Sequence, residues 1–148
     1  MRPYKRIERC IARYIAKRYC KVVEVGVGGN FETAEELVRS GCTVICTDIR
    51  IPPFFPLELN VRKDDVFRPI EKIYEGADLL YAIRPGVEMV PPMISLAQQI
   101  NADLLVYHLG DELFEGGGRV IECGVPLHQY YFRKEERSRF SLQKQDKI

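Results

Sequence analysis

A glycine-rich segment between a predicted strand and a predicted helix constrains the fold of this chain more than any other feature. The segment follows two valines and reads Glu24-Val25-Gly26-Val27-Gly28-Gly29-Asn30. Apolar residues at helical spacing follow it, from Phe31 to Val38. The glycines therefore lie at a strand-to-helix turn, where backbone without side chains can approach a ligand closely.

A second predicted strand ends in an acidic residue. The apolar run 44–47 is followed by Asp48, about 20 residues after the glycines. In nucleotide-binding α/β folds, an acidic side chain at this place accepts hydrogen bonds from ribose hydroxyls. A strand-ending aspartate alone is equally well explained as a turn cap, and a glycine turn can be purely structural. Their order and spacing together favour a nucleotide site.

The charges around the turn bear on which nucleotide it would take. A dinucleotide fingerprint requires a third glycine where this chain has Phe31, which argues against an NAD-linked oxidoreductase. A diphosphate also favours positive charge at the helix start. Here the helix start is acidic, with no Lys or Arg before Arg39, and the acidic residues are Glu24, Glu32, Glu35 and Glu36. S-adenosylmethionine carries an ammonium and a sulfonium and no phosphate, so this charge pattern favours it.

At these residues the chain resembles the class I S-adenosylmethionine-dependent methyltransferases. Glu24, Gly26 and Gly28 match the acidic residue and alternating glycines of their first motif, whereas Asn30 replaces the usual third glycine and Gly29 is an extra one. The whole sequence also resembles a family of small, uncharacterised, Rossmann-like archaeal proteins.

The resemblance implies roles for residues after the second and third strands. It implies that Asp48 binds the ribose and that Ile49 lies against the adenine. In the segment 63–67 it implies that Asp65, with Val66 beside it, accepts a hydrogen bond from the adenine amino group. The expected ligand is S-adenosylmethionine or its product S-adenosylhomocysteine. The implied activity is methyl transfer to an unknown acceptor; the alternative is a non-catalytic nucleotide-binding or scaffold module.

Strand and helix patterns alternate along the chain and predict one α/β domain over residues 1–148, a three-layer Rossmann-like fold with a mostly parallel sheet. We expect helices over residues 5–19, 31–40, shortly after Pro69, and 93–100. We expect strands over residues 21–25, 42–48, 59–63, 77–83 and 104–108, with a closing antiparallel pair over 119–123 and 127–132. Residues 134–148 are expected to form a mobile tail.

The last third is short for a full methyltransferase. About ten residues, 109–118, separate the fifth strand from the closing pair, which leaves no room for a long fifth helix. The fourth strand ends at Arg84 and lacks the Asn or Asp, two prolines and aromatic of amino-directed methyltransferases. Two weak catalytic candidates remain. Arg84 would bind an anionic acceptor or pair with Glu88, and His108 would take a proton from the acceptor or serve as a structural group.

The formal net charge of +1 is unevenly distributed. Residues 1–21 carry net +7, residues 22–132 net −9, and residues 133–148 net +3. The basic N-terminal helix predicts an RNA partner or, alternatively, a solvated face or a contact with another copy of the chain. Its basic residues, interleaved with Tyr4 and Tyr14, are Arg2, Lys5, Arg6, Arg9, Arg13, Lys17 and Arg18.

Composition sets the remaining expectations. A hydrophobic content of 46% over 148 residues is enough for one ordinary core, and no apolar run is long enough to span a bilayer. The amino terminus is charged and does not resemble a secretory signal, and the five cysteines show no C-x-x-C spacing. We therefore expect a cytoplasmic protein with no metal site.

Overall fold

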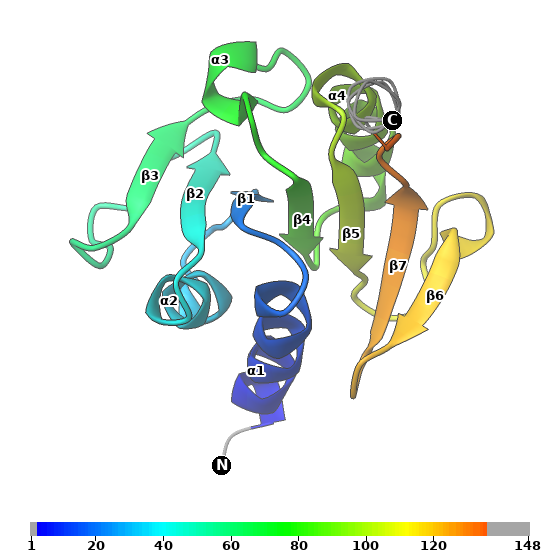
Figure 1. Ribbon diagram of the computed structural model, residues 1–148, viewed down its shortest axis with the longest axis horizontal. Coiled ribbons are helices and arrows are strands. Elements are labelled where there is room, and N and C mark those ends of the chain that lie inside the picture. The colour runs from blue at the N-terminus through cyan, green and yellow to red at the C-terminus, as the bar shows by residue number, and fades with distance from the viewer. Residues whose placement is uncertain (1–2, 136–148) are drawn as a thin grey trace, which may run out of the picture.

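The computed structural model describes residues 3–135, with side chains from residue 6 onward, and shows one sheet between two layers of helices (Figure 1). The predicted three-layer α/β arrangement is confirmed. The prediction of a mobile tail falls almost wholly on residues 136–148, which lie outside the described part of the chain.

The sheet has seven strands in the order β3-β2-β1-β4-β5-β7-β6. Its strands are β1 (Lys21–Val25), β2 (Thr43–Asp48), β3 (Asn60–Lys63), β4 (Leu79–Ile83), β5 (Asp103–Tyr107), β6 (Arg119–Glu122) and β7 (Pro126–Tyr131). The first five are parallel, and β7 pairs antiparallel with both β5 and β6. The closing antiparallel pair is thus where the sequence predicted it.

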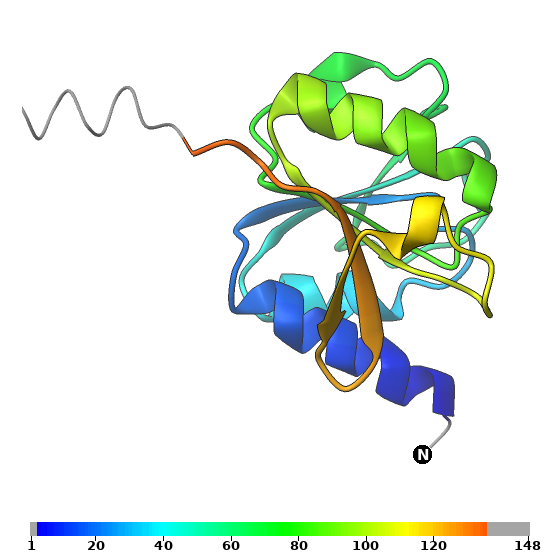
Figure 2. The same cartoon turned by 90° about the vertical axis from the view of Figure 1, so that its right-hand side faces the viewer.

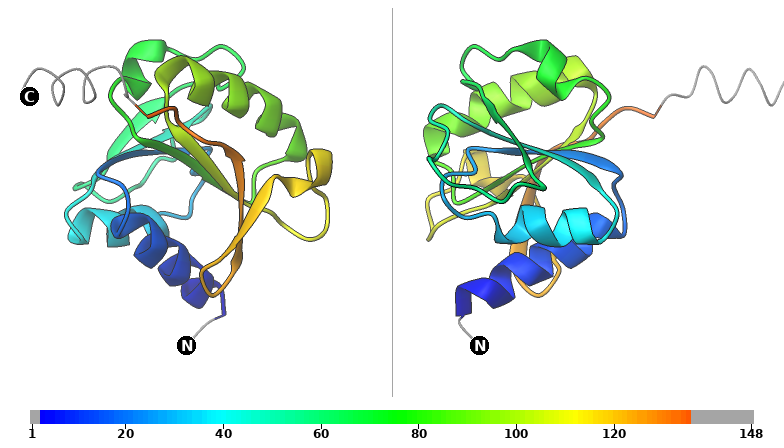
Figure 3. Two further views of the ribbon diagram at one scale, coloured as in Figure 1. Left: turned by 45° about the vertical axis from the view of Figure 1, so that its right-hand side comes forward. Right: turned by 90° about the vertical axis from the view of Figure 1, so that its left-hand side faces the viewer.

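Helices cover both faces of the sheet (Figures 2 and 3). The α-helices are α1 (Pro3–Ala16), α2 (Glu32–Arg39), α3 (Glu71–Tyr74) and α4 (Val90–Ile100), and the short 3₁₀ turns are η1 (Val87–Met89) and η2 (Glu115–Gly117). Helices α1 and α2 pack on the face that carries Val22, whereas α3 and α4 pack on the face that carries Val23. Adjacent residues of one strand therefore enter opposite cores, as parallel strands buried on both faces require.

Helix α1 ends earlier than the predicted residue 19. The amides of Arg18 and Tyr19 both donate to the Ile15 carbonyl, which closes the last turn. Tyr19 then turns into the core, and its hydroxyl donates a 2.6 Å hydrogen bond to Asp103. The long-range contact of Tyr19 explains why the apolar spacing alone placed the end of the helix too late.

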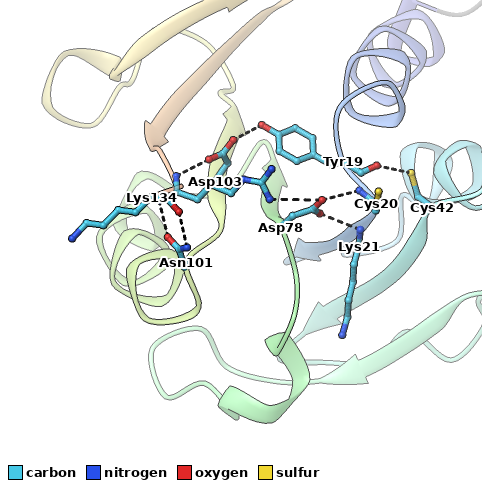
Figure 4. A network of polar contacts seen from close by, with 9 residues as sticks. Tyr19, Cys20, Lys21, Cys42, Asp78, Asn101, Asp103 and Lys134 are labelled. Carbon is cyan, nitrogen blue, oxygen red and sulfur yellow. Dashed lines mark hydrogen bonds and ion pairs between the residues drawn. The ribbon is translucent and has the colours of Figure 1, made fainter. Parts of the chain in front are cut away.

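Hydrogen bonds to two carboxylates connect neighbouring strands at the amino edge of the sheet (Figure 4). Asp78, just before β4, accepts hydrogen bonds from the amides of Cys20 and Lys21 at 2.9 and 3.1 Å. Asp103, at the start of β5, accepts one from the Arg133 amide at 2.7 Å. These bonds fix the starts of three parallel strands and the end of β7. The loops at the opposite, carboxyl edge are the ones available for a ligand.

Candidate functional site

The glycine loop, residues 26–30, begins where β1 ends and lies against β2. The amides of Gly26 and Val27 both donate to the Thr47 carbonyl, at 2.8 and 3.0 Å. Gly26 and Gly28 have φ angles of +70° and +59°, a region that side chains disfavour. A Cβ added at Gly28 or Gly29 would meet no atom within 4 Å, so both glycines border open space. The loop has the bare, accessible backbone that the sequence predicted.

Asp48 is joined directly to the glycine loop. Its Oδ2 accepts a 2.8 Å hydrogen bond from the Gly28 amide, and its Oδ1 accepts a 3.1 Å hydrogen bond from the Arg50 amide. A carboxylate has about four lone-pair positions, so each oxygen keeps capacity to accept a further hydrogen bond. The structure therefore brings together the two sequence features on which the nucleotide prediction depends. The adjacent Ile49 is 58% exposed, which leaves its side chain free to cover a flat ring.

Asn30 and Phe31 explain how the loop closes without the third glycine. Asn30 Oδ1 accepts a 3.1 Å hydrogen bond from the amide of Glu32, the first residue of α2, so its side chain closes the turn that leads into the helix. Phe31 is buried, and its ring lies 6.4 Å from that of Phe55 in the loop between β2 and β3. This position is thus filled by core packing, where a dinucleotide fingerprint would need a glycine.

The two neighbouring aspartates in the turn after β3 have different roles. Asp64 is buried, accepts the Ile70 amide at 2.9 Å and accepts the Tyr74 hydroxyl, so it is a structural residue. Asp65 is exposed and accepts the Phe67 amide at 3.0 Å. The Asp64 amide donates to the Asp48 carbonyl, which places this turn beside the end of β2. Of the pair, Asp65 is the one open to a ligand.

Val66 lies in the core on the α3 and α4 face. Its side chain is buried, so any part that this residue takes in the site falls to its backbone.

Glu24 is the candidate whose surroundings differ most from the expectation. Its side chain is only 2% exposed, and Oε1 accepts a 2.7 Å hydrogen bond from the Tyr81 hydroxyl. Burial raises the pKa of Glu24 to about 8, with a smaller contribution from Glu8. The group is therefore mostly neutral at pH 7, and the attraction for a cation that we expected from its charge is not supplied there. The acidic residues of α2 and Asp48 remain the negative groups nearest in sequence to the loop.

Arg84 pairs with α1 and not with Glu88, so the predicted alternative partner is wrong. Arg84 Nη2 lies 3.1 Å from Glu8 Oε1, and the two groups form an ion pair without a hydrogen bond. Glu8 is 1% exposed and also accepts the Thr33 hydroxyl at 3.3 Å. Arg84 itself has a φ of +55°, and its guanidinium is 5.3 Å from the Tyr107 ring centroid. Its charge is thus already compensated by a buried carboxylate.

His108 is a buried group in contact with β7. Its Nε2 lies 2.6 Å from the Tyr130 hydroxyl, and its ring centroid is 5.0 Å from that of His128. Burial, with a smaller effect of His128, lowers the pKa of His108. The neutral imidazole therefore has a structural hydrogen bond, which was the alternative stated for it from the sequence.

The site also includes a residue that the sequence analysis did not find. The Met89 methyl group lies 3.3 Å from where a Cβ on Gly26 would be, so Met89 forms a wall beside the glycine loop. Three strands and two helices separate it from Gly26 in the sequence, and no local motif marks it.

Within residues 3–135 no cluster of His, Cys, Asp or Glu is placed to hold a metal ion. No helix in the same range is long and apolar enough to cross a membrane.

These observations test whether S-adenosylmethionine suits the residues present. The backbone at Gly28 and Gly29 borders open space, and exposed or partly exposed groups at the ends of β2 and β3 supply carboxylates and an apolar surface. No lysine or arginine occurs from Glu24 to Val38. The donor set therefore fits a cationic nucleoside better than a diphosphate.

A family model described as "Uncharacterised protein family (UPF0146)" matches residues 7–124. The chain belongs to the UPF0146 family. A UPF0146 protein of Archaeoglobus fulgidus is 40% identical to it over 106 residues, which cover 71% of this chain and 81% of the relative.

Solved structures place this UPF0146 chain in the fold of the class I methyltransferases. A SAM-dependent methyltransferase from Archaeoglobus fulgidus superposes with a TM-score of 0.52 at 19% identity, over 69% of this chain and 51% of that protein. The Escherichia coli protein yhhF, a proposed methyltransferase, gives a TM-score of 0.55 at 11% identity, over 92% of this chain and 89% of its own. At such identities the likeness shows the fold alone.

Proposed function

We propose that this UPF0146 protein binds S-adenosylmethionine or S-adenosylhomocysteine at the carboxyl edge of β1, β2 and β3, as a methyltransferase-like protein. One observation carries the proposal. The Gly28 amide donates a 2.8 Å hydrogen bond to Asp48, which joins the glycine loop to the acidic residue after β2. The contact lies beyond the carboxyl ends of two adjacent parallel strands, β1 and β2, and this is the edge at which open α/β sheets generally bind their ligands.

Each residue of the site has a defined part in binding. Asp48 accepts hydrogen bonds from the ribose hydroxyls with the lone pairs that Gly28 and Arg50 leave available. The exposed Ile49 covers the adenine ring, and the Asp65 carboxylate accepts a hydrogen bond from the adenine amino group. Gly28 and Gly29 admit the ligand to within contact of the backbone.

Methyl transfer is the reaction that such a ligand supplies. When bound, S-adenosylmethionine gives its methyl group to a nucleophile: a bond from the acceptor to carbon forms, the carbon–sulfur bond breaks, and S-adenosylhomocysteine leaves. The protein's contribution is to hold donor and acceptor in line, worth up to ~7–11 kcal/mol in well-oriented systems. An acceptor that is already nucleophilic requires no protein base, which agrees with the structural contacts of His108.

A second candidate function is a nucleoside-binding module without catalysis. It is favoured by the contacts of the two catalytic candidates, because Arg84 is paired with Glu8 and His108 is buried against Tyr130. An NAD-linked oxidoreductase is disfavoured by the buried Phe31 at the third glycine position.

Calorimetry with the purified protein tests the ligand. S-adenosylmethionine or S-adenosylhomocysteine should bind, and NAD should not; binding of NAD alone would overturn the proposal. A methyl-label assay on total RNA and protein extract then separates the two candidate functions. Transfer of label that requires the protein supports an enzyme, whereas nucleoside binding without transfer supports the module.

A further inference from the structure

A groove of about 620 Å³ is lined by residues of α1, of the turn after it and of the β6–β7 hairpin, and by none of the glycine loop. One wall consists of residues of α1 from Cys10 to Tyr14 and of Lys17 and Arg18 in the turn that follows the helix. The other wall consists of β6 and the adjacent Cys123. Gly124 closes one end, because a Cβ there would lie 2.8 Å from Cys10 Sγ. At 3.3 Å per extended residue, the wall from Arg119 to Cys123 is roughly 13 Å long.

The groove is strongly basic. Four of its lining residues are cationic, Arg13, Lys17, Arg18 and Arg119, and all four are exposed. Among the described residues, no carboxylate forms an ion pair with any of these four. This concentration of uncompensated charge in a domain whose middle section is net negative favours a partner that carries phosphates.

Arg18 also presents a flat surface. Its guanidinium carbon lies 3.8 Å from the centroid of the Tyr14 ring, and Nη1 donates to the Tyr14 carbonyl at 3.1 Å. These two contacts hold the guanidinium over the Tyr14 ring, and both residues line the groove. Planes of arginine and aromatic side chains are the surfaces on which unpaired bases stack.

One acidic residue interrupts the basic lining. Glu122 is exposed on β6 and has no ion-pair partner within the described part of the chain. A lone carboxylate weakens phosphate binding, but it can accept a hydrogen bond from a ribose 2′-hydroxyl, the group by which proteins distinguish RNA from DNA.

We propose that this groove binds single-stranded RNA. Arg13, Lys17 and Arg119 contact phosphates, the Arg18–Tyr14 pair stacks on a base, and Glu122 accepts a 2′-hydroxyl. The inference goes beyond the proposed function and does not depend on it, because RNA binding here requires no methyl donor. A groove of this length holds a short stretch of backbone, so recognition of a structured duplex is not required.

The test measures affinity of the full chain for a short, fluorescein-labelled RNA of mixed sequence, without methyl donor, at several salt concentrations. Replacing Arg13, Lys17 and Arg119 by glutamine should weaken binding about tenfold or more at low salt. It should also reduce the slope of log affinity against log salt by about 2, at ~0.7 for each lost phosphate contact on a single strand. A matched control replaces Arg62, Arg68 and Lys72, exposed cations at the β3 end of the molecule, and should change little.

Two single substitutions test base and sugar recognition. Arg18→Lys keeps the charge but loses the plane, so RNA binding should weaken about fivefold or more while inorganic polyphosphate binds as before. Glu122→Ala should lower the ratio of RNA to DNA affinity without weakening DNA binding. Circular dichroism melting of every variant checks that the fold is retained.

Three results would overturn the inference. The first is equal weakening by the groove and control triple variants, which would mean a non-specific charge effect. The second is that Arg18→Lys leaves the affinities for both polyphosphate and RNA unchanged, which would mean a phosphate site without base recognition. The third is a dimer, seen in sedimentation, that the groove substitutions dissociate, because another copy of the chain would then occupy the groove.

Discussion

Asp48 holds the glycine loop in place with the same carboxylate that a ribose would contact. Asp48→Asn keeps the size of the side chain but turns one acceptor into a donor and removes the charge. We expect nucleoside binding to weaken by about 1–3 kcal/mol, the usual cost of losing a charged hydrogen-bond acceptor. Calorimetry with S-adenosylhomocysteine measures this; unchanged affinity would remove Asp48 from the site.

Asp64 is the matched control for Asp48, because it follows the neighbouring strand but has only structural partners. Asp64→Asn should lower the free energy of unfolding by about 1–3 kcal/mol while the remaining folded protein keeps its affinity. A loss of affinity without a loss of stability would reverse the two assignments.

Glu24 makes stability depend on pH in the direction opposite to most carboxylates. Its pKa is about 8 in the folded protein and near 4.5 when exposed, so the folded state holds its proton more tightly. Unfolding therefore releases a proton between these values, and stability falls as pH rises from about 4.5 to about 8. Glu24→Gln keeps an acceptor for the Tyr81 hydroxyl and removes this titration.

We expect Glu24→Gln to raise the free energy of unfolding by about 2–4 kcal/mol more at pH 9 than at pH 5, since one pKa unit corresponds to about 1.4 kcal/mol. Urea unfolding at the two pH values measures the difference. An equal effect at both would show that Glu24 is ionised in the folded protein.

These residues show how far local sequence patterns reach. Gly28 and Asp48 were predictable because their roles follow from a strand end and a spacing, both local properties. The neutral state of Glu24 was not, because it follows from burial of the side chain among elements that are distant in the sequence. Its hydrogen-bond partner Tyr81, for example, lies on the next strand of the sheet but 57 residues away.

At the scale of elements, the pair of Arg84 and Glu8 joins the end of β4 to helix α1. Arg84→Gln leaves Glu8 buried with the Thr33 hydroxyl as its one hydrogen-bond donor among the described side chains. Breaking a buried pair from one side costs about 3–5 kcal/mol, and the 26% exposure of the Arg84 side chain reduces this to an expected loss of about 1–3 kcal/mol. The double variant with Glu8→Gln should regain much of that loss in urea unfolding.

An exposed ion pair of Arg39 on α2 provides the comparison for the Arg84 and Glu8 variants. It pairs with Glu36 at 3.0 Å, but its side chain is 60% exposed. Arg39→Gln should lower the free energy of unfolding much less than Arg84→Gln does, because ion pairs between solvent-exposed groups contribute little. If Arg84→Gln costs no more than Arg39→Gln, the Glu8 contact does not stabilise the junction of β4 and α1.

The type of each element was predictable, whereas helix ends and pairings between elements were not. Apolar periodicity identified the strands because a parallel sheet buries them on both faces. The sequence offered Glu88, four residues from Arg84, as a helical partner, yet the true partner lies on the first helix. Such contacts are set by which helix covers which face, and that information is spread over the whole chain.

At the scale of the molecule, the two proposed binding regions lie on different parts of one sheet. The nucleoside site is built from loops after β1, β2 and β3, whereas the basic groove lies between α1 and β6 at the other end of the strand order. Helix α1 connects them, because its Glu8 contacts Arg84 at the end of β4 and its Cys10, two residues further on, lines the groove. Binding at either region should thus leave the backbone of the other nearly unchanged.

Hydrogen exchange with mass spectrometry tests this separation on the intact protein. S-adenosylhomocysteine should slow exchange in peptides that cover residues 26–31, 48–52 and 64–68, because bound ligand suppresses the local openings through which loop amides exchange. Peptides over residues 119–125 should be unaffected by it and protected by RNA instead. The apolar strands β4 and β5 are an internal control, since their amides already exchange slowly with either ligand. Protection of both regions by one ligand would mean that the loops and the groove form a single site, with α1 as the element that connects them.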